Sequence, residues 1–155
     1  MGNEKTVRIG IIGCGGIANG KHMPSLRQIP GVQMVAFCDI IEERARKAKQ
    51  DYGTPDAAVY TDYRKLLEDK TIDVVHVCTP NRAHSFITVD ALHAGKHVMC
   101  EKPMAINAAE AKKMLDAAKE TGKLLTIGYQ SRQRADAQYM KQECLAGTFG
   151  DIYYA

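Results

Sequence analysis

A short glycine-rich segment near the start of the chain has the spacing of a phosphate-binding turn. Gly13, Gly15 and Ala18 fit a Gly-x-Gly-x-x-Gly/Ala pattern after residues with strand character. The first glycine of such a turn permits a sharp bend, the second lets the backbone approach a pyrophosphate, and the small third residue packs helix against strand. A helix beginning at Gly16 and Ile17 would offer free N–H groups to the phosphates. These five residues therefore predict a dinucleotide site, although such a turn can also bind nothing.

An acidic residue stands where the second predicted strand ends. Asp39 lies at the distance downstream of the glycine turn where a carboxylate can accept hydrogen bonds from the adenosine ribose. Its negative charge would repel a 2′-phosphate, so it favours NAD over NADP. We expect Asp39 and the adjacent Ile40 to line the adenosine half of the cofactor. An aspartate after a strand can also simply shape a turn.

Strand and helix patterns alternate along the whole chain, which is typical of parallel crossovers covered by helices. They predict a doubly wound, Rossmann-type α/β fold, with a mostly parallel sheet and helices on both faces. The predicted strands are 6–12, 32–38, 58–60, 72–78, 97–100 and 124–128, the predicted helices are 16–28, 41–52, 62–67, 84–94, 107–121 and 133–145, and 151–155 has strand character.

Composition excludes several classes of protein. The chain has 155 residues, a formal charge of +3 and no basic cluster free of acidic residues, so nucleic acid is not an expected partner. No run of apolar residues could cross a membrane, and we expect a cytoplasmic protein. The five cysteines lack paired spacing, and the histidines show no metal-ligand spacing. We therefore expect buried free thiols and no metal.

Two further segments with chemical side chains follow predicted strands, at the edge of the sheet where α/β proteins bind ligands. They are Cys78-Thr79-Pro80-Asn81-Arg82-Ala83-His84 and Glu101-Lys102-Pro103. Together with the glycine turn and Gly128-Tyr129-Gln130-Ser131-Arg132, they closely resemble the glucose-fructose oxidoreductase, inositol dehydrogenase and rhizopine-catabolism family of oxidoreductases. The resemblance covers nearly the whole chain.

This resemblance implies roles that spacing alone does not show. Lys102 would lie by the nicotinamide ribose with Glu101 and would orient or deprotonate the reacting hydroxyl, which makes it the candidate catalytic residue. His84 is expected to support the loop or the cofactor site, and bonding to backbone is an equally open role. The other residues expected at the cofactor, in addition to the glycine turn and Asp39, are Thr79, Pro80, Asn81, Glu101 and, on the substrate side, Gln130.

The family resemblance also implies a domain plan. Residues 1–128 would form the dinucleotide-binding domain, and 129–155 would form a connecting helix and the start of a second α/β domain that continues beyond Ala155. That domain would face the substrate, hold a second catalytic residue and build a homo-oligomer. The expected function is NAD-dependent hydride transfer at a hydroxyl of a sugar, polyol or glycoside. Two alternatives stay open: a non-catalytic NAD-binding module, and a glycoside-cleaving enzyme that oxidises its substrate transiently.

Overall fold

Six parallel strands form one sheet in the computed structural model, which describes residues 6–153. Their order across the sheet is β3-β2-β1-β4-β5-β6. The chain runs outward from β1 to β3, returns to the centre and continues from β4 to β6, so the direction of winding reverses between β1 and β4. The strands are β1 (Val7–Ile12), β2 (Val32–Cys38), β3 (Ala58–Tyr60), β4 (Val74–Val77), β5 (His97–Cys100) and β6 (Leu125–Ile127).

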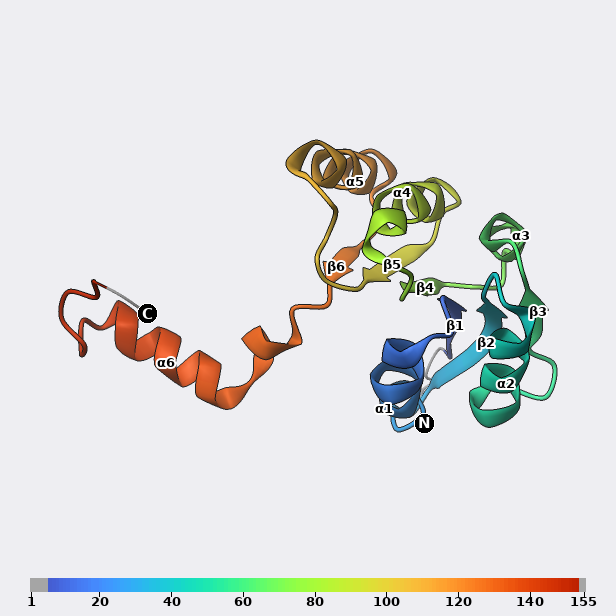
Figure 1. Cartoon of the computed structure of the whole chain (residues 1–155), viewed down its shortest axis with the longest axis horizontal. Helices are drawn as coiled ribbons and strands as arrows, with labels where there is room; N and C mark the ends of the chain where they lie inside the picture. Colours follow the sequence, from blue (N-terminus) through green and yellow to red (C-terminus); the bar gives the residue numbers. More distant parts are fainter. Residues whose placement is uncertain (1–5, 154–155) are drawn as a thin grey trace.

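Helices cover both faces of this sheet (Figure 1). On one face α3 (Tyr63–Glu68), α4 (His84–His93) and α5 (Ala108–Thr121) bury apolar side chains such as Leu66, Ile87 and Met114. On the other face α1 (Met23–Leu26) and α2 (Glu42–Tyr52) bury Met23 and Ala48. Burial of these apolar faces is the main driving force for folding. The predicted doubly wound fold is thus confirmed.

The helix that follows the glycine turn is not the single regular helix expected over 16–28. It contains a π-helical segment, η1 (Ala18–His22), in which the Met23 amide donates to the Ala18 carbonyl, before α1 ends at Leu26. Pro24 has no N–H, and its ring would clash with the carbonyl four residues earlier in a regular helix. The wider turn before Pro24 relieves this conflict, and such turns occur frequently at functional sites.

Side-chain caps begin two of the helices. Asp62 accepts a hydrogen bond from the Arg64 amide at the start of α3, and Asn107 accepts one from the Glu110 amide at the start of α5. The pairing at α5 is only half of a capping box, because Glu110 does not return a hydrogen bond to Asn107. Its carboxylate instead contacts the Ser85 hydroxyl at 2.5 Å, which links α5 to α4.

The last part of the chain stands apart from the sheet. After the short η3 (Gln130–Gln133), α6 (Ala135–Leu145) extends away from the other elements and has no buried residue (Figure 1). The strand expected over 151–155 is wrong for 151–153, which are irregular, because no strand lies beside them to supply hydrogen bonds; 154–155 lie outside the described residues. No helix in the described part of the chain is long and apolar enough to cross a membrane.

Candidate functional site

The glycine turn brings the ends of β1 and β4 into close contact. Gly13 has a φ of +91°, and a Cβ there would lie 2.8 Å from the carbonyl carbon and oxygen of Cys78. No other residue type fits both constraints. A Cβ on Gly15 or Gly16 would meet nothing within 4 Å. The turn therefore leaves an open cradle of free space at Gly15 and Gly16, beside the first helical residues.

Asp39 braces this turn from the end of β2. Its Oδ2 accepts a hydrogen bond from the Cys14 amide and its Oδ1 accepts one from the Ile41 amide, both at 2.9 Å. The side chain is buried, whereas the adjacent Ile40 is 89% exposed and presents an apolar surface beside it. Each carboxylate oxygen can accept more than one hydrogen bond. Asp39 can therefore hold the turn and still accept from a ligand hydroxyl.

The segment after β4 approaches the same edge. Thr79 places its buried hydroxyl oxygen where it has no hydrogen-bond partner among residues 6–153. Pro80 and Asn81 are exposed, and the short η2 (Asn81–Ala83) follows. A buried hydroxyl without a partner is unfavourable in a ligand-free protein. The hydrogen-bonding capacity of this hydroxyl is thus left unused by residues 6–153.

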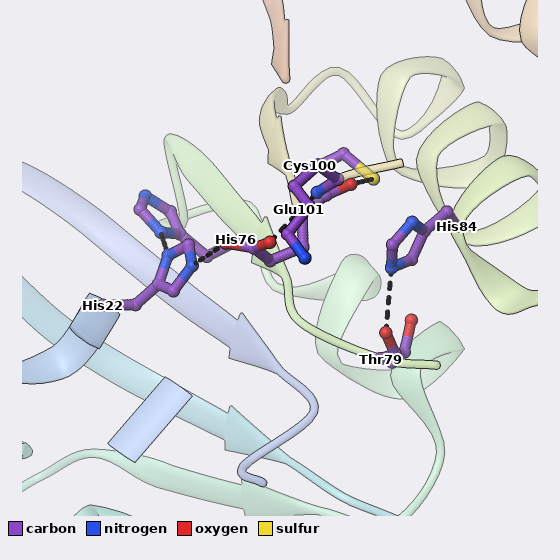
Figure 2. A network of polar contacts seen from close by, with 7 residues as sticks. His22, His76, Thr79, His84, Cys100 and Glu101 are labelled. Atoms are coloured by element: carbon purple, nitrogen blue, oxygen red, sulfur yellow. Dashed lines mark hydrogen bonds and ion pairs between the residues drawn. The ribbon is translucent and has the colours of Figure 1, made fainter. Parts of the chain in front are cut away.

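His84 joins this segment to the one that carries Lys102. Its Nε2 lies 2.8 Å from the Thr79 carbonyl oxygen and its Nδ1 lies 2.8 Å from the Pro103 carbonyl oxygen, as Figure 2 shows in part. The ring is fully buried. Carbonyl oxygens only accept, so each contact is a hydrogen bond when the facing nitrogen carries a proton. His84 thus bonds to backbone and also supports the loop, which unites the two roles that the sequence left open.

Two neighbouring residues after β5 differ sharply in environment. Glu101 is buried, whereas Lys102 is exposed at the edge of the sheet. The Glu101 Oε2 accepts a hydrogen bond from the Lys102 backbone amide at 3.0 Å, and its Oε1 lies 2.8 Å from His22 Nε2. A Cβ on Gly128, at the end of β6, would lie 3.1 Å from the same Oε1. The carboxylate is therefore enclosed on several sides.

Two histidines that the sequence analysis did not place at the cofactor, His22 and His76, belong to this site. His22 lies between Glu101 and His76, and its Nδ1 is 3.0 Å from His76 Nδ1 (Figure 2). Burial, with His22 nearby, lowers the pKa of His76 to about 4. No spacing in the sequence could reveal this group, because its members come from η1, β4 and the segment after β5.

Four cysteines also gather at this edge, and all four are buried. Burial raises the pKa of the Cys14 and Cys38 thiols to about 12, with Asp39 adding to the effect, and it raises the pKa of Cys100 to about 11. The thiols therefore stay neutral and pack as small apolar groups. Cys144 is exposed instead. Within residues 6–153 no cluster of His, Cys, Asp and Glu is placed to hold a metal ion.

The residues predicted from the sequence thus fall into two groups. The glycine turn, Asp39, the segment after β4 and Glu101-Lys102 lie at the carboxyl ends of β1, β2, β4 and β5, which run parallel and meet at one edge. Gln130 is exposed in η3, past the end of β6 and far along the sheet from Asp39. Two surface hollows, of about 350 and 510 Å³, involve α3 with α4 and α2 with β3 and contain none of these residues.

Three features of this edge fit an anionic, hydroxyl-rich ligand: the open cradle at the glycine turn, a helix start without a side-chain cap, and the unpartnered hydroxyl of Thr79. They lie where the sheet reverses its direction of winding, which is where such sheets bind ligands. Fold and site together define a dinucleotide-binding Rossmann domain. The chain belongs to the oxidoreductase family with an NAD-binding Rossmann fold, whose profile matches residues 7–129. This membership confirms the resemblance drawn from the sequence.

Known relatives are sugar and polyol dehydrogenases. The chain is 37% identical over 147 residues to D-glucoside 3-dehydrogenase of Escherichia coli, covering 95% of this chain and 41% of that protein. It is 35% identical over 146 residues to inositol 2-dehydrogenase of Salmonella paratyphi B, covering 94% and 43%. The chain therefore spans about two fifths of the length of these relatives.

Solved structures agree with this assignment. The WlbA dehydrogenase of Bordetella pertussis, in complex with NADH and UDP-GlcNAcA, matches with a TM-score of 0.87 and 28% identity over 99% of this chain and 43% of that one. A variant of KijD10, a 3-ketoreductase of Actinomadura kijaniata in complex with TDP-benzene and NADP, matches with a TM-score of 0.86 and 27% identity over 96% and 46%. One of these structures holds NADH and the other NADP.

Proposed function

We propose that this chain is the cofactor-binding part of an NAD-dependent oxidoreductase that transfers a hydride between nicotinamide and a hydroxyl-bearing carbon of a sugar, polyol or glycoside. One observation carries the proposal: an open backbone cradle and an exposed lysine, Lys102, occupy the same edge of the sheet in a member of this family. The cradle suits the diphosphate of a cofactor, and the lysine is a candidate base beside it.

The glycine turn would hold the pyrophosphate. Gly13 sets the bend, and the open space at Gly15 and Gly16 lets phosphate oxygens reach the backbone amides. Ile17 contributes an amide from the first helical turn. Ala18 is fully buried, which allows the helix to lie close against the sheet. These contacts depend on backbone rather than on side-chain charge.

Asp39 supports NAD over NADP as the cofactor. Its carboxylate is fixed by the Cys14 and Ile41 amides and has lone pairs left for the two ribose hydroxyls. A 2′-phosphate would meet this negative charge at close range. The exposed Ile40 would cover one face of the adenosine.

The nicotinamide half would lie toward β4 and β5. The free Thr79 hydroxyl, with Pro80 and Asn81, would line the cofactor, and His84 would keep this segment against the one that follows β5. Glu101 would stabilise the part of the site that lies by the nicotinamide ribose. Gln130 would approach from the substrate side.

Lys102 would act on the hydroxyl that is oxidised. Bound NAD supplies the hydride acceptor. The hydroxyl must lose its proton as the hydride leaves, so a positioned base is needed. Lys102 is exposed at the edge of the sheet, and its backbone amide is held by Glu101, so its side chain can reach a substrate while its Cα stays fixed.

The remaining parts of the proposal concern the protein as a whole. Residues 1–128 would form the cofactor domain, and 129–155 would connect it to a second domain that selects the substrate and builds a homo-oligomer; the absence of buried residues in α6 supports this division. The free thiols support a reducing compartment such as the cytoplasm.

The alternative of a non-catalytic NAD-binding module has a specific observation in its favour. Within residues 6–153, Lys102 is hydrogen-bonded through its backbone amide and no side chain contacts its amino group. Such a module would bind NAD at the same cradle and leave a polyol unchanged.

Calorimetric titration of the chain with NAD and NADP tests the cofactor part of the proposal. NAD should bind saturably, and NADP should bind at least about tenfold more weakly, which corresponds to roughly 1.4 kcal/mol. Gly15→Ala is the matched variant, because it fills the cradle without touching protein atoms. Equal binding of NAD by wild type and Gly15→Ala, or no binding at all, would contradict the proposal.

A further inference from the structure

The Glu101 carboxyl group lies in a place where little could compensate for a negative charge. It is 6% exposed, and both carboxylate oxygens have one close partner: the Lys102 amide at Oε2 and the His22 ring at Oε1. A buried charge is costly unless it is paired and hydrogen-bonded. Of these two partners, only His22 is a side chain that can also carry a positive charge.

The other titratable groups around the carboxylate do not replace His22. Burial raises the pKa of the Cys78 and Cys100 thiols, with Glu101 adding to the effect, so both stay neutral. His76 faces His22 rather than Glu101, and burial keeps its pKa near 4, so it is neutral at physiological pH.

The contact between the two histidines fixes the direction of the His22 ring. Nδ1 of His22 lies against Nδ1 of His76, so one of these nitrogens donates and the other accepts. In either case Nε2 of His22 faces the carboxylate and must carry a proton to bond to it. His76 therefore holds the ring so that its Nε2 faces Glu101 (Figure 2).

We propose that His22 is a positioning residue for Lys102. The hydrogen bond from His22 keeps the Glu101 carboxylate in contact with the Lys102 backbone amide. His22 belongs to the π-helical segment that follows the glycine turn, so it couples the phosphate-binding element to the segment that carries the candidate base. The catalytic role of Lys102 rests on the proposed function. The hydrogen-bond chain from His22 to the Lys102 amide does not depend on it.

The test measures the rate of hydrogen exchange at one backbone amide of the chain, that of Lys102. In His22→Leu, hydrogen exchange at the Lys102 amide should become at least tenfold faster relative to amides in the centre of α5, because Glu101 loses its partner and leaves its place. His22→Gln retains an N–H donor and should restore most of this protection. His93→Gln changes an exposed histidine on α4 and should leave exchange at Lys102 unaltered.

Ligand binding provides the second readout. His22→Leu should weaken NADH at least fivefold and leave ADP, which lacks the nicotinamide half, within twofold. An equal loss of both ligands would mean that His22 acts through the glycine turn, and unchanged protection of the Lys102 amide would refute the coupling.

Two further results keep the inference testable. If His22→Leu does not fold, the imidazole ¹⁵N spectrum of the wild type decides: a protonated Nε2 of His22 that responds to Glu101→Gln supports the inference, and an unprotonated one refutes it. If wild type fails to bind NADH, the proposed function fails, while the exchange measurement still decides the role of His22.

Discussion

Gly13 and Gly15, two of the glycines of the turn, should respond differently to substitution by alanine. In Gly13→Ala the new Cβ would lie 2.8 Å from the Cys78 carbonyl group, on a backbone with φ of +91°. Backbone strain of this kind costs about 1–3 kcal/mol, and forcing an atom into packed structure costs about as much again. We expect a loss of about 2–6 kcal/mol in the free energy of unfolding, and the middle of this range would lower Tm by roughly 10 °C.

The Gly15→Ala variant should be as stable as the wild type but should bind NAD more weakly. Its Cβ meets no protein atom within 4 Å and its φ is not positive, so the free energy of unfolding should stay within about 0.5 kcal/mol of wild type. The same methyl group would occupy the space of the pyrophosphate and weaken NAD at least about tenfold. Gly20→Ala, also in open space, is the control for both measurements.

Urea unfolding and NADH fluorescence titration of the three variants measure both effects. The reasoning would be refuted if Gly13→Ala were as stable as wild type, or if Gly15→Ala bound NADH with wild-type affinity. Either result would mean that the turn does not serve as the close contact and the open cradle described above.

Three other perturbations test the remaining parts of the site. Asp39→Ala should weaken NAD, reduce its preference over NADP and cost about 1–3 kcal/mol of stability, because the Cys14 and Ile41 amides lose their acceptor; calorimetry with both cofactors would show an unchanged preference if Asp39 is not the ribose ligand. Lys102→Ala should leave NAD affinity within a few fold and lower kcat for a polyol roughly a hundredfold in a protein of the relatives' length; an unchanged kcat removes Lys102 from the chemistry. His76 has a folded-state pKa of about 4, below its unfolded value of 6.5, so the unfolded chain binds more protons between these values and stability should fall by roughly 2–3 kcal/mol as pH drops from 6.5 to 4. The same fall in His76→Gln would assign it to other groups.

Local sequence signals identify the parts of the site that depend on backbone. The pattern Gly13, Gly15 and Ala18 specifies a turn because each small residue answers a steric need that can be stated in advance. The ends of β4 and β5 follow from apolar runs, and parallel pairing brings whatever follows them to one edge. The fold, and the meeting of these segments at one edge of the sheet, could therefore be predicted.

Contacts between distant side chains could not be predicted in this way. His22, His76 and Glu101 are separated by 54 and 25 positions in the sequence, and they come from the π-helical segment η1, from β4 and from the segment after β5. Asp39 was expected either to bind the ribose or to shape a turn. Its bond to the Ile41 amide is such a local contact, whereas its bond to the Cys14 amide forms only when the glycine turn is folded beside it. The expected strand at 151–153 failed because a strand needs a neighbour, which a pattern of residue types does not supply.

Amide chemical-shift mapping of the chain during NAD titration tests the central claim most directly. The account predicts that saturable shifts appear together at Gly15, Gly16, Thr79 and Lys102, at the carboxyl edge of the sheet, and that α6 is unaffected. Shifts confined to other surfaces, or shifts at the glycine turn without any at Lys102, would contradict the claim that cofactor and candidate base share one site.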